Sequence, residues 1–215
     1  MTGYSAWPDD TLRRAFLTFR GDMTEIEVRT ATHSEIGRCV ATIVLAFSGD
    51  PAARWAFADP QVYFEIFPRF VCAFGGKAFD QGSAHHIAGR AVALWIPPGL
   101  GPDEDAIIAL IEHAVPESER QAIFSAFEQM AKFHPAEPHW YLPLIGTDPA
   151  QQGRGHGSAL LRHALAICDR DKLPAYLEAS SPRNVPLYKR HGFEVLGNIQ
   201  AGNSPVITPM LRQPR

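Results

Sequence analysis

The residues best suited to chemistry form one short segment of consecutive positions, Gln152-Gly153-Arg154-Gly155-His156-Gly157. It lies between an apolar run, Trp140 to Ile145, and a run with helical periodicity, Ser158 to Cys168. A glycine-rich turn from a strand into a helix exposes backbone N–H groups, because the first turn of a helix has no internal acceptors for them. These amides and the helix dipole favour an anion, and glycine lets the backbone approach it closely. The segment therefore predicts a binding site for a phosphorylated small molecule.

Three kinds of phosphate loop compete for this segment. The nucleoside-triphosphatase loop requires Lys directly after its last glycine, and no Lys follows here. The dinucleotide loop requires Gly-x-Gly-x-x-Gly and an acidic residue further on; Glu178 suits the second condition, but glycines at 153, 155 and 157 miss the first. The third pattern, Gln/Arg-x-x-Gly-x-Gly/Ala, matches Gln152, Gly155 and Gly157.

A second motif lies one helix and one short strand downstream. The run Asn184-Val185-Pro186-Leu187-Tyr188-Lys189-Arg190-His191-Gly192-Phe193 follows the pattern Asn-x-x-(apolar)-Tyr-x-x-x-Gly-Phe. With the glycine loop and the Thr147-Asp148-Pro149 that precedes it, this run resembles the two signatures of the GNAT superfamily of N-acetyltransferases. The segments Leu177 to Asn184 and Ala93-Leu94-Trp95 resemble the puromycin N-acetyltransferase branch of that superfamily.

The resemblance implies an α/β (α+β) fold: a mixed, largely antiparallel sheet, splayed between its fourth and fifth strands, with helices on both faces. Residues 139–198 would form the acetyl-CoA-binding half of one domain spanning 23–215, and residues 1–22 an N-terminal extension with a possible helix at 7–19. We expect a first strand near Ile26 and Val28, a helix over 35–47 capped by Ser34, and strands at 85–87 and 91–96. The region 103–133 reads as two helices inserted before the fourth strand, 139–146. Beyond it we expect a helix at 155–171, strands at 175–179, 193–199 and 205–211, and a helix at 184–190.

The same resemblance assigns the cofactor contacts. The diphosphate of acetyl-CoA, as cosubstrate, would accept hydrogen bonds from the loop amides, and its pantetheine arm would pair with the fourth strand. The residues expected to bind the cofactor are Ile145, Gly146, Thr147, Gln152, Gly153, Arg154, Gly155, His156, Gly157, Ser158, Asn184 and Tyr188.

Acetyl transfer to an amine requires a proton donor for the departing thiolate and a neutral amine. Tyr188 is the candidate general acid, because a phenol with an ordinary pKa near 10 keeps its proton at neutral pH. Glu178, at the end of the splayed strand, is the candidate base, with His139 and Tyr141 as alternatives and a chain of waters as another.

The acceptor is expected to be the amine of a small molecule, antibiotic-like or metabolic. Aromatic residues concentrate between positions 55 and 74, and we expect Trp55, Phe57 and Tyr141 to line the acceptor pocket. A protein or peptide acceptor, and a non-catalytic acyl-CoA-binding module, remain alternatives.

Composition excludes several other classes. The net charge of −3 argues against non-specific nucleic-acid binding, and no apolar run approaches the ~20 residues that a membrane span requires. Residues 1–22 lack the apolar core of a secretory signal. The widely spaced Cys39, Cys72 and Cys168 read as buried free thiols of a cytoplasmic protein, and no spacing predicts a metal site. Adjacent His85 and His86 would face opposite sides of a strand, so they could not bind one metal ion together. The sequence leaves open whether the protein is a monomer or a homodimer.

Overall fold

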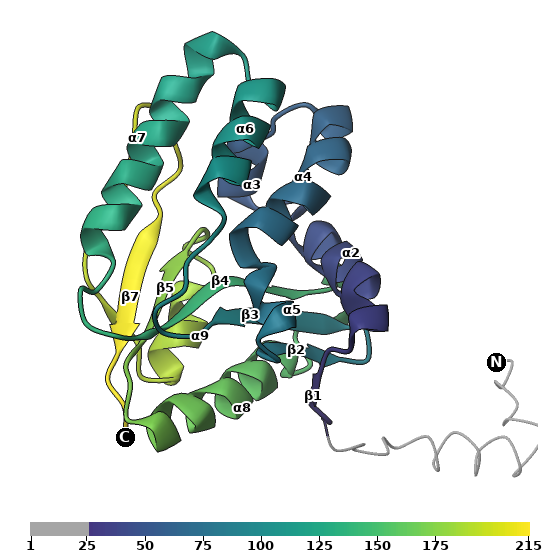
Figure 1. Cartoon of the computed structure of the whole chain (residues 1–215), viewed down its shortest axis with the longest axis vertical. Coiled ribbons are helices and arrows are strands. Elements are labelled where there is room, and N and C mark those ends of the chain that lie inside the picture. The colour runs from purple at the N-terminus through teal and green to yellow at the C-terminus, as the bar shows by residue number, and fades with distance from the viewer. Residues whose placement is uncertain (1–25) are drawn as a thin grey trace, which may run out of the picture.

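A computed structural model of the chain describes residues 26–215. The expected extension at 1–22 and the expected helix at 7–19 lie outside the described residues. Within them, one sheet runs through the whole structure, with helices on both of its faces (Figure 1). The assignment of 23–215 to a single domain stays a prediction.

The sheet has seven strands in the order β1-β2-β3-β4-β5-β7-β6. All neighbouring strands are antiparallel except β4 and β5, which are parallel. This confirms the expected mixed, largely antiparallel sheet. The strands are β1 (Arg29–Thr30), β2 (Ala84–Ile87), β3 (Ala91–Ile96), β4 (Trp140–Thr147), β5 (Ala175–Ala179), β6 (Glu194–Val195) and β7 (Thr208–Arg212).

Two layers of helices cover the sheet. One face carries α2 (Ile36–Phe47), α3 (Pro51–Ala56), α4 (Pro60–Gly75), α5 (Lys77–Asp80), α6 (Glu104–Ala114) and α7 (Glu117–Phe133). The other face carries α8 (His156–Asp171) and α9 (Val185–Arg190). Short 3-10 turns, η1 (His33–Glu35) and η2 (Pro149–Gln151), precede α2 and α8.

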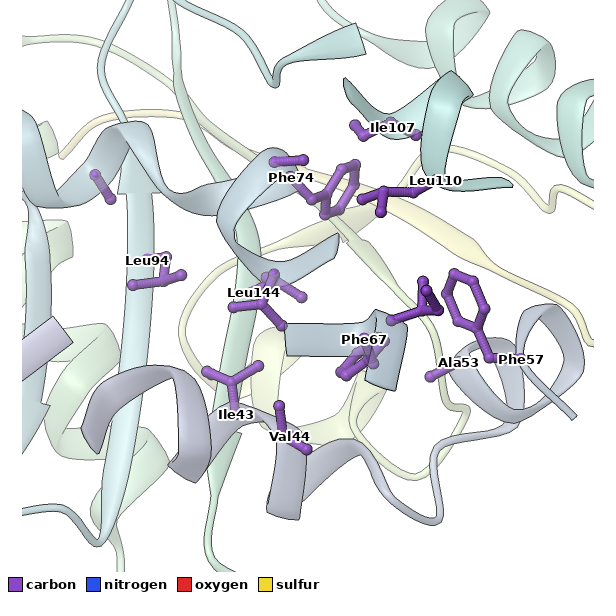
Figure 2. Close-up of a cluster of buried hydrophobic side chains, with 14 of the residues drawn as sticks. Ile43, Val44, Ala53, Phe57, Phe67, Phe74, Leu94, Ile107, Leu110 and Leu144 are labelled. Atoms are coloured by element: carbon purple, nitrogen blue, oxygen red, sulfur yellow. The ribbon is translucent and has the colours of Figure 1, made fainter. Parts of the chain in front are cut away.

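The larger of two hydrophobic clusters lies between the sheet and helices α2 to α7. Figure 2 shows Ile43 of α2, Phe67 of α4, Leu94 of β3 and Leu144 of β4 converging in it. Alternation along each strand divides the clusters: Tyr176 of β5 belongs to this one, while its neighbours in the strand belong to the cluster under α8 and α9. Glu178 of β5 follows Tyr176 on the same face of the sheet, and Ser180 follows just beyond the end of the strand. Both side chains therefore point toward α2 to α7.

Local sequence signals explain how the helices of the first layer begin. The first helical segment starts from Thr32, whose hydroxyl and backbone N–H both bond the Glu35 carboxylate in a capping box. The expected cap at Ser34 was therefore wrong, since that residue lies within η1. Asp50 and Asp59 cap α3 and α4 differently, with their own side chains: each carboxylate accepts two backbone N–H groups ahead of a helix that starts with proline.

The expected order of elements is confirmed, and the main errors are at the edge strands. Two helices, α6 and α7, stand between β3 and β4 as the region 103–133 predicted. The strand expected at 193–199 is regular only over Glu194–Val195, and the chain pairs again with the segment before β7 at an isolated bridge between Ile199 and Ile207. Between these two points Gly197 passes close to the Phe133 ring, where an added Cβ would lie 2.8 Å from it. The first strand starts at Arg29, and Ile26 and Val28 pack instead against the cluster under α8.

The cysteines and paired histidines are placed as follows. Cys39 and Cys168 are buried free thiols as expected. Cys72 is a free thiol exposed on α4, so the expectation that it is buried was wrong.

His85 and His86 do face opposite sides of β2. The His85 ring lies 4.6 Å from that of His163 on α8, and His86 Nε2 lies 3.5 Å from Glu35 Oε1. The pair therefore has no shared space in which to bind one ion.

Candidate active site

The sheet opens between its two parallel strands. β4 pairs with β5 only from Trp140–Ala175 to Leu142–Leu177. The next residue of β4 is Pro143, which has no N–H to donate to a neighbouring strand. Beyond it β4 remains paired with β3 as far as Thr147, and β5 with β7 as far as Ala179. The facing edges of β4 and β5 are therefore unpaired beyond Leu142, which confirms the expected splay.

A groove of about 470 Å³ lies at this opening, next to the N-terminus of α8. Gly153 and Gly155 turn the chain into the helix with φ of 76° and 82°, a region that only glycine adopts readily. The predicted cofactor residues that line the groove are Ile145, Gly146, Thr147, Gln152, Gly153, Gly155, His156, Gly157, Asn184 and Tyr188. The structure thus brings together ten of the twelve residues that were predicted to bind the cofactor.

The two remaining predicted residues lie outside the groove. Arg154 is exposed, and Ser158 bonds the His191 ring, with 3.0 Å between Oγ and Nε2. Gln152 directs its amide to the Thr147 carbonyl at 3.5 Å, which closes the loop as expected. Arg183 also lines the groove. It lies in the segment from Leu177 to Asn184, but the sequence analysis did not predict that it binds the cofactor.

His156 provides independent evidence for a polar ligand here. Its side chain is buried, yet neither ring nitrogen has a hydrogen-bond partner among residues 26–215. Burial lowers the pKa of His156, and the nearby Arg90 and Arg154 act in the same direction. A buried imidazole beside a groove, together with the free amides at the start of a long helix, fits a phosphorylated ligand.

An apolar cavity of about 120 Å³ lies on the other side of the opening, toward α3, α4 and α7. Trp55 and Phe57, two of the three residues predicted to line an acceptor pocket, line this cavity. Trp55 is held by a 3.0 Å bond from Nε1 to Asn203 Oδ1. The third predicted acceptor residue, Tyr141, is not part of the lining and lies behind Glu178. The aromatic lining comprises Phe47, Trp55, Phe57, Phe67, Phe70, Phe74, Phe127 and Tyr188.

Tyr188 stands where the cavity and the groove meet, since it lines both. Its α9 helix starts after Asn184, which lies one turn earlier and also lines both spaces. Burial raises the pKa of Tyr188, and the nearby Asp50 raises it further. The phenol is therefore protonated at neutral pH and able to donate.

Glu178 lines the cavity within a cluster of aromatic and imidazole side chains. Burial raises the pKa of its carboxyl to about 7, while the phenols of Tyr141 and Tyr176 lower it. His134 Nε2 lies 3.5 Å from Glu178 Oε1, and the other nitrogen of His134 lies 3.3 Å from His139 Nε2. Burial also lowers the pKa of His134 to about 4, so its ring is neutral where Glu178 titrates. Glu178 can therefore exchange a proton near neutral pH.

A second carboxylate in the cavity was not predicted from the sequence. Asp50 accepts a 2.6 Å hydrogen bond from Ser180 Oγ, and burial raises the pKa of its carboxyl. Both residues line the cavity. In the sequence, Asp50-Pro51 is an ordinary helix start, so nothing marked it as a site residue.

Residues 26–215 contain no group of three or more His, Cys, Asp and Glu side chains placed to hold a metal ion. None of the helices in this range is long and apolar enough to cross a membrane.

Comparison with known proteins supports the motif assignment. The profile of the acetyltransferase (GNAT) family matches residues 54–193. An uncharacterised N-acetyltransferase of Schizosaccharomyces pombe is 27% identical over 176 residues, covering 73% of this chain and 69% of that protein.

Solved structures share the fold over most of the chain. A Corynebacterium glutamicum protein described as related to histone acetyltransferase is 27% identical, with a TM-score of 0.61 over 87% of this chain and 96% of that one. A Drosophila melanogaster polyamine N-acetyltransferase that forms N-acetylagmatine is 12% identical, with a TM-score of 0.58 over 87% and 99%. A putative arylalkylamine N-acetyltransferase of Aedes aegypti is 13% identical, with a TM-score of 0.61 over 86% of each chain.

Proposed function

The chain belongs to the GNAT acetyltransferase family, and on that premise we propose that it transfers the acetyl group of acetyl-CoA to the amine of a small molecule. The observation that carries this proposal is the meeting of a polar groove and an aromatic cavity at Tyr188. One space suits a diphosphate ligand, the other an apolar ligand, and a proton donor stands between them.

The groove would hold acetyl-CoA, which supplies an acetyl group activated as a thioester. The amides of Gly153, Gly155, His156 and Gly157 would bind its diphosphate at the start of α8, and the buried His156 ring would gain a polar partner. The unpaired edge of β4 beyond Leu142 would align the pantetheine amides. One further backbone N–H of this edge would stabilise the oxyanion.

Tyr188 is the protein group proposed for donating a proton. The Tyr188 hydroxyl would give its proton to the departing sulfur, because its raised pKa keeps it protonated. A carboxylate that lines the cavity would take the proton that the acceptor loses; the sequence predicts Glu178 for this role, and its pKa is about 7. His139 and Tyr141, the other candidates from the sequence, lie behind Glu178 in the same cluster and do not line the cavity.

The cavity has a volume of only about 120 Å³ and a mainly aromatic and aliphatic lining, which favours a small acceptor over a protein or peptide. The resemblance to the puromycin N-acetyltransferase branch stays a prediction, as do cytoplasmic location and the choice between monomer and homodimer. The names of the structural relatives cover polyamines, arylalkylamines and histones, so the fold does not itself select the acceptor.

A panel of primary amines, incubated with acetyl-CoA while free thiol is followed, tests this function. We expect turnover with at least one small amine and none with peptides. Tyr188→Phe should lower kcat by roughly 10²- to 10⁴-fold, the usual contribution of a general acid, and leave acetyl-CoA affinity unchanged. Acetyl-CoA binding without turnover of any amine would identify a non-catalytic acyl-CoA-binding module. An absence of acetyl-CoA binding would refute the function altogether.

A further inference from the structure

The residues that line both the cavity and the groove mark the point where an acceptor amine can reach the acetyl group. They are Phe47, Asp50, Ile145, Asn184 and Tyr188. Asp50 is the one acidic residue of this set, whereas Glu178 lines the cavity alone. The carboxylate at the junction is therefore Asp50.

We propose that Asp50 binds the ammonium group of the acceptor at this junction and takes one proton from it through Oδ2. The inference rests on the proposed function and deepens it, because it assigns the base of that reaction to Asp50 instead of Glu178. It also defines the acceptor as a primary amine carried on a compact apolar group.

The hydrogen bonds of Asp50 leave it one free acceptor position. A carboxylate has about four lone-pair sites on its two oxygens. Oδ1 accepts the backbone N–H groups of Ala52 at 3.0 Å and Ala53 at 3.1 Å, and Oδ2 accepts the Ser180 hydroxyl. These three bonds fix the carboxylate in place, and the remaining site on Oδ2 is available to a ligand.

No protein cation competes for this site in the described part of the chain. The ion pairs found there join other residues, and none includes Asp50. The titratable groups around Asp50 are Tyr188 of α9, Tyr63 of α4, Arg54 of α3 and Glu178 of β5, and His156 and Arg183 line the groove that Asp50 borders. Arg54 is directed elsewhere, over the Tyr63 ring at 4.9 Å and onto the Ala58 carbonyl. Burial is the main cause that raises the pKa of Asp50, and the Ser180 bond opposes it.

The cavity defines the rest of the ligand. Its volume of about 120 Å³ is close to that of the ~150 Å³ apolar cavities that accommodate benzene. Its lining carries two carboxyl groups, no lysine and no arginine, and is otherwise mainly aromatic and aliphatic. A cationic head at Asp50 and one ring or a short alkyl chain behind it match this space in both charge and size.

The proton transfers balance over one turnover. Asp50 Oδ2 takes a proton from the ammonium nitrogen as the N–H bond breaks, and later releases it to water through the open groove. Tyr188 then gives its phenolic proton to sulfur as the C–N bond forms and the C–S bond breaks. The second proton leaving nitrogen returns to the Tyr188 oxygen, so an ammonium and a thioester yield an amide, a thiol and one released proton.

The test compares two amines that differ in basicity. The first is the amine from the panel that the wild type acetylates fastest, and the second is its β,β-difluorinated analogue. The assay pH is set above the pKa of the fluorinated amine and below that of the basic one, so that the first amine is protonated and the second largely neutral. Asp50→Asn should lower kcat/KM by about 100-fold or more for the basic amine and by less than about tenfold for the fluorinated one. A structural role would lower both equally.

Asp59→Asn is the matched control. Asp59 caps α4 with the same geometry, accepting two N–H groups before a Pro, and it lines neither space. Asn is as good a cap as Asp, so both variants should fold. We expect Asp59→Asn to leave both rates unchanged, and Glu178→Gln to affect both amines alike.

Two further measurements test the role of Asp50: the pH profile of a Ser180 variant, and the binding of the amine in the absence of acetyl-CoA. Ser180→Ala removes the donor that lowers the pKa of Asp50, so the acid limb of kcat/KM should move to higher pH. In calorimetry without acetyl-CoA, the wild type should bind the basic amine more tightly than its uncharged alcohol analogue, and Asp50→Asn should lose that preference. Equal losses for the two amines in Asp50→Asn, or a basicity-dependent loss in Glu178→Gln, would overturn the assignment. Wild-type protein that acetylates no amine would refute the proposed function itself.

Discussion

Replacing Glu178 by Gln should stabilise the protein at alkaline pH. Burial raises the pKa of this carboxyl from 4.5 to about 7, and its side chain is only 4% exposed. Each pKa unit corresponds to about 1.36 kcal/mol, so ionising Glu178 in the folded state costs about 3 kcal/mol. The unfolded chain releases this proton near pH 4.5 and the folded protein only near 7, so stability falls as pH rises across that window.

The assay is urea or thermal unfolding of the wild type and Glu178→Gln between pH 5 and pH 8. The variant has no carboxyl to ionise, so its advantage should grow by roughly 2–3 kcal/mol across this range, or about 4–12 °C in Tm. His134, Tyr141 and Tyr176 face Glu178 and stay neutral here, because their own pKa values are shifted away from this window. A stability difference that is the same at both ends of the range would refute the reasoning.

Three further outcomes follow from other parts of the structure. Burial lowers the pKa of His85 to about 4, so this residue alone should make unfolding about 3 kcal/mol easier as pH falls from 6.5 to 4. In acid denaturation series, His85→Asn should lose this part of the dependence and keep the part that comes from His134. Gly155→Ala places a side chain at φ 82°, which should cost about 1–2 kcal/mol of stability in thermal unfolding and weaken acetyl-CoA binding measured by calorimetry. Gly146→Ala would bring a Cβ to 2.7 Å from that of Ala46 on α2, and the resulting overpacking should lower stability by about 1–3 kcal/mol in urea titrations.

Local patterns carried enough information to predict the cofactor half of the molecule. The glycine loop, the helix after it and the Asn184–Tyr188 motif are continuous in sequence, and their geometry depends on near neighbours such as Gly153 and Gly155. The strand at 175–179 was predicted at its observed bounds because its apolar pattern is bounded by Pro174 and by Ser180-Ser181-Pro182. The differences there are the strand at 193–199, which is regular only over Glu194–Val195, and single side chains such as Ser158, which lies outside the groove and bonds His191, 33 positions away.

The acceptor half could not be predicted in the same detail, because tertiary contacts create it. Asp50 becomes a site residue only through Ser180, which is 130 positions away. Tyr141 was expected in the acceptor pocket, but with Tyr176 and His134 it forms the ring cluster behind Glu178. Aromatic residues in α3 and α4 were recognised as candidates, yet which of them face the cavity depends on how α7 packs against α4, for example through Phe74 and Phe127.

The position of the reaction within the fold follows from one break in backbone pairing. Since β4 and β5 part after Leu142, the groove and the cavity open toward each other at the same point in the sheet. Ile145 of β4, Asn184 and Tyr188 of the segment after β5, and Asp50 of the loop before α3 all border that opening. The first three lie in or beside the motifs proposed to bind the cofactor, whereas Asp50 belongs to the α2–α3 connection, which borders the proposed acceptor space. Under the proposed function, recognition of the amine can therefore change through this connection while the groove keeps its form.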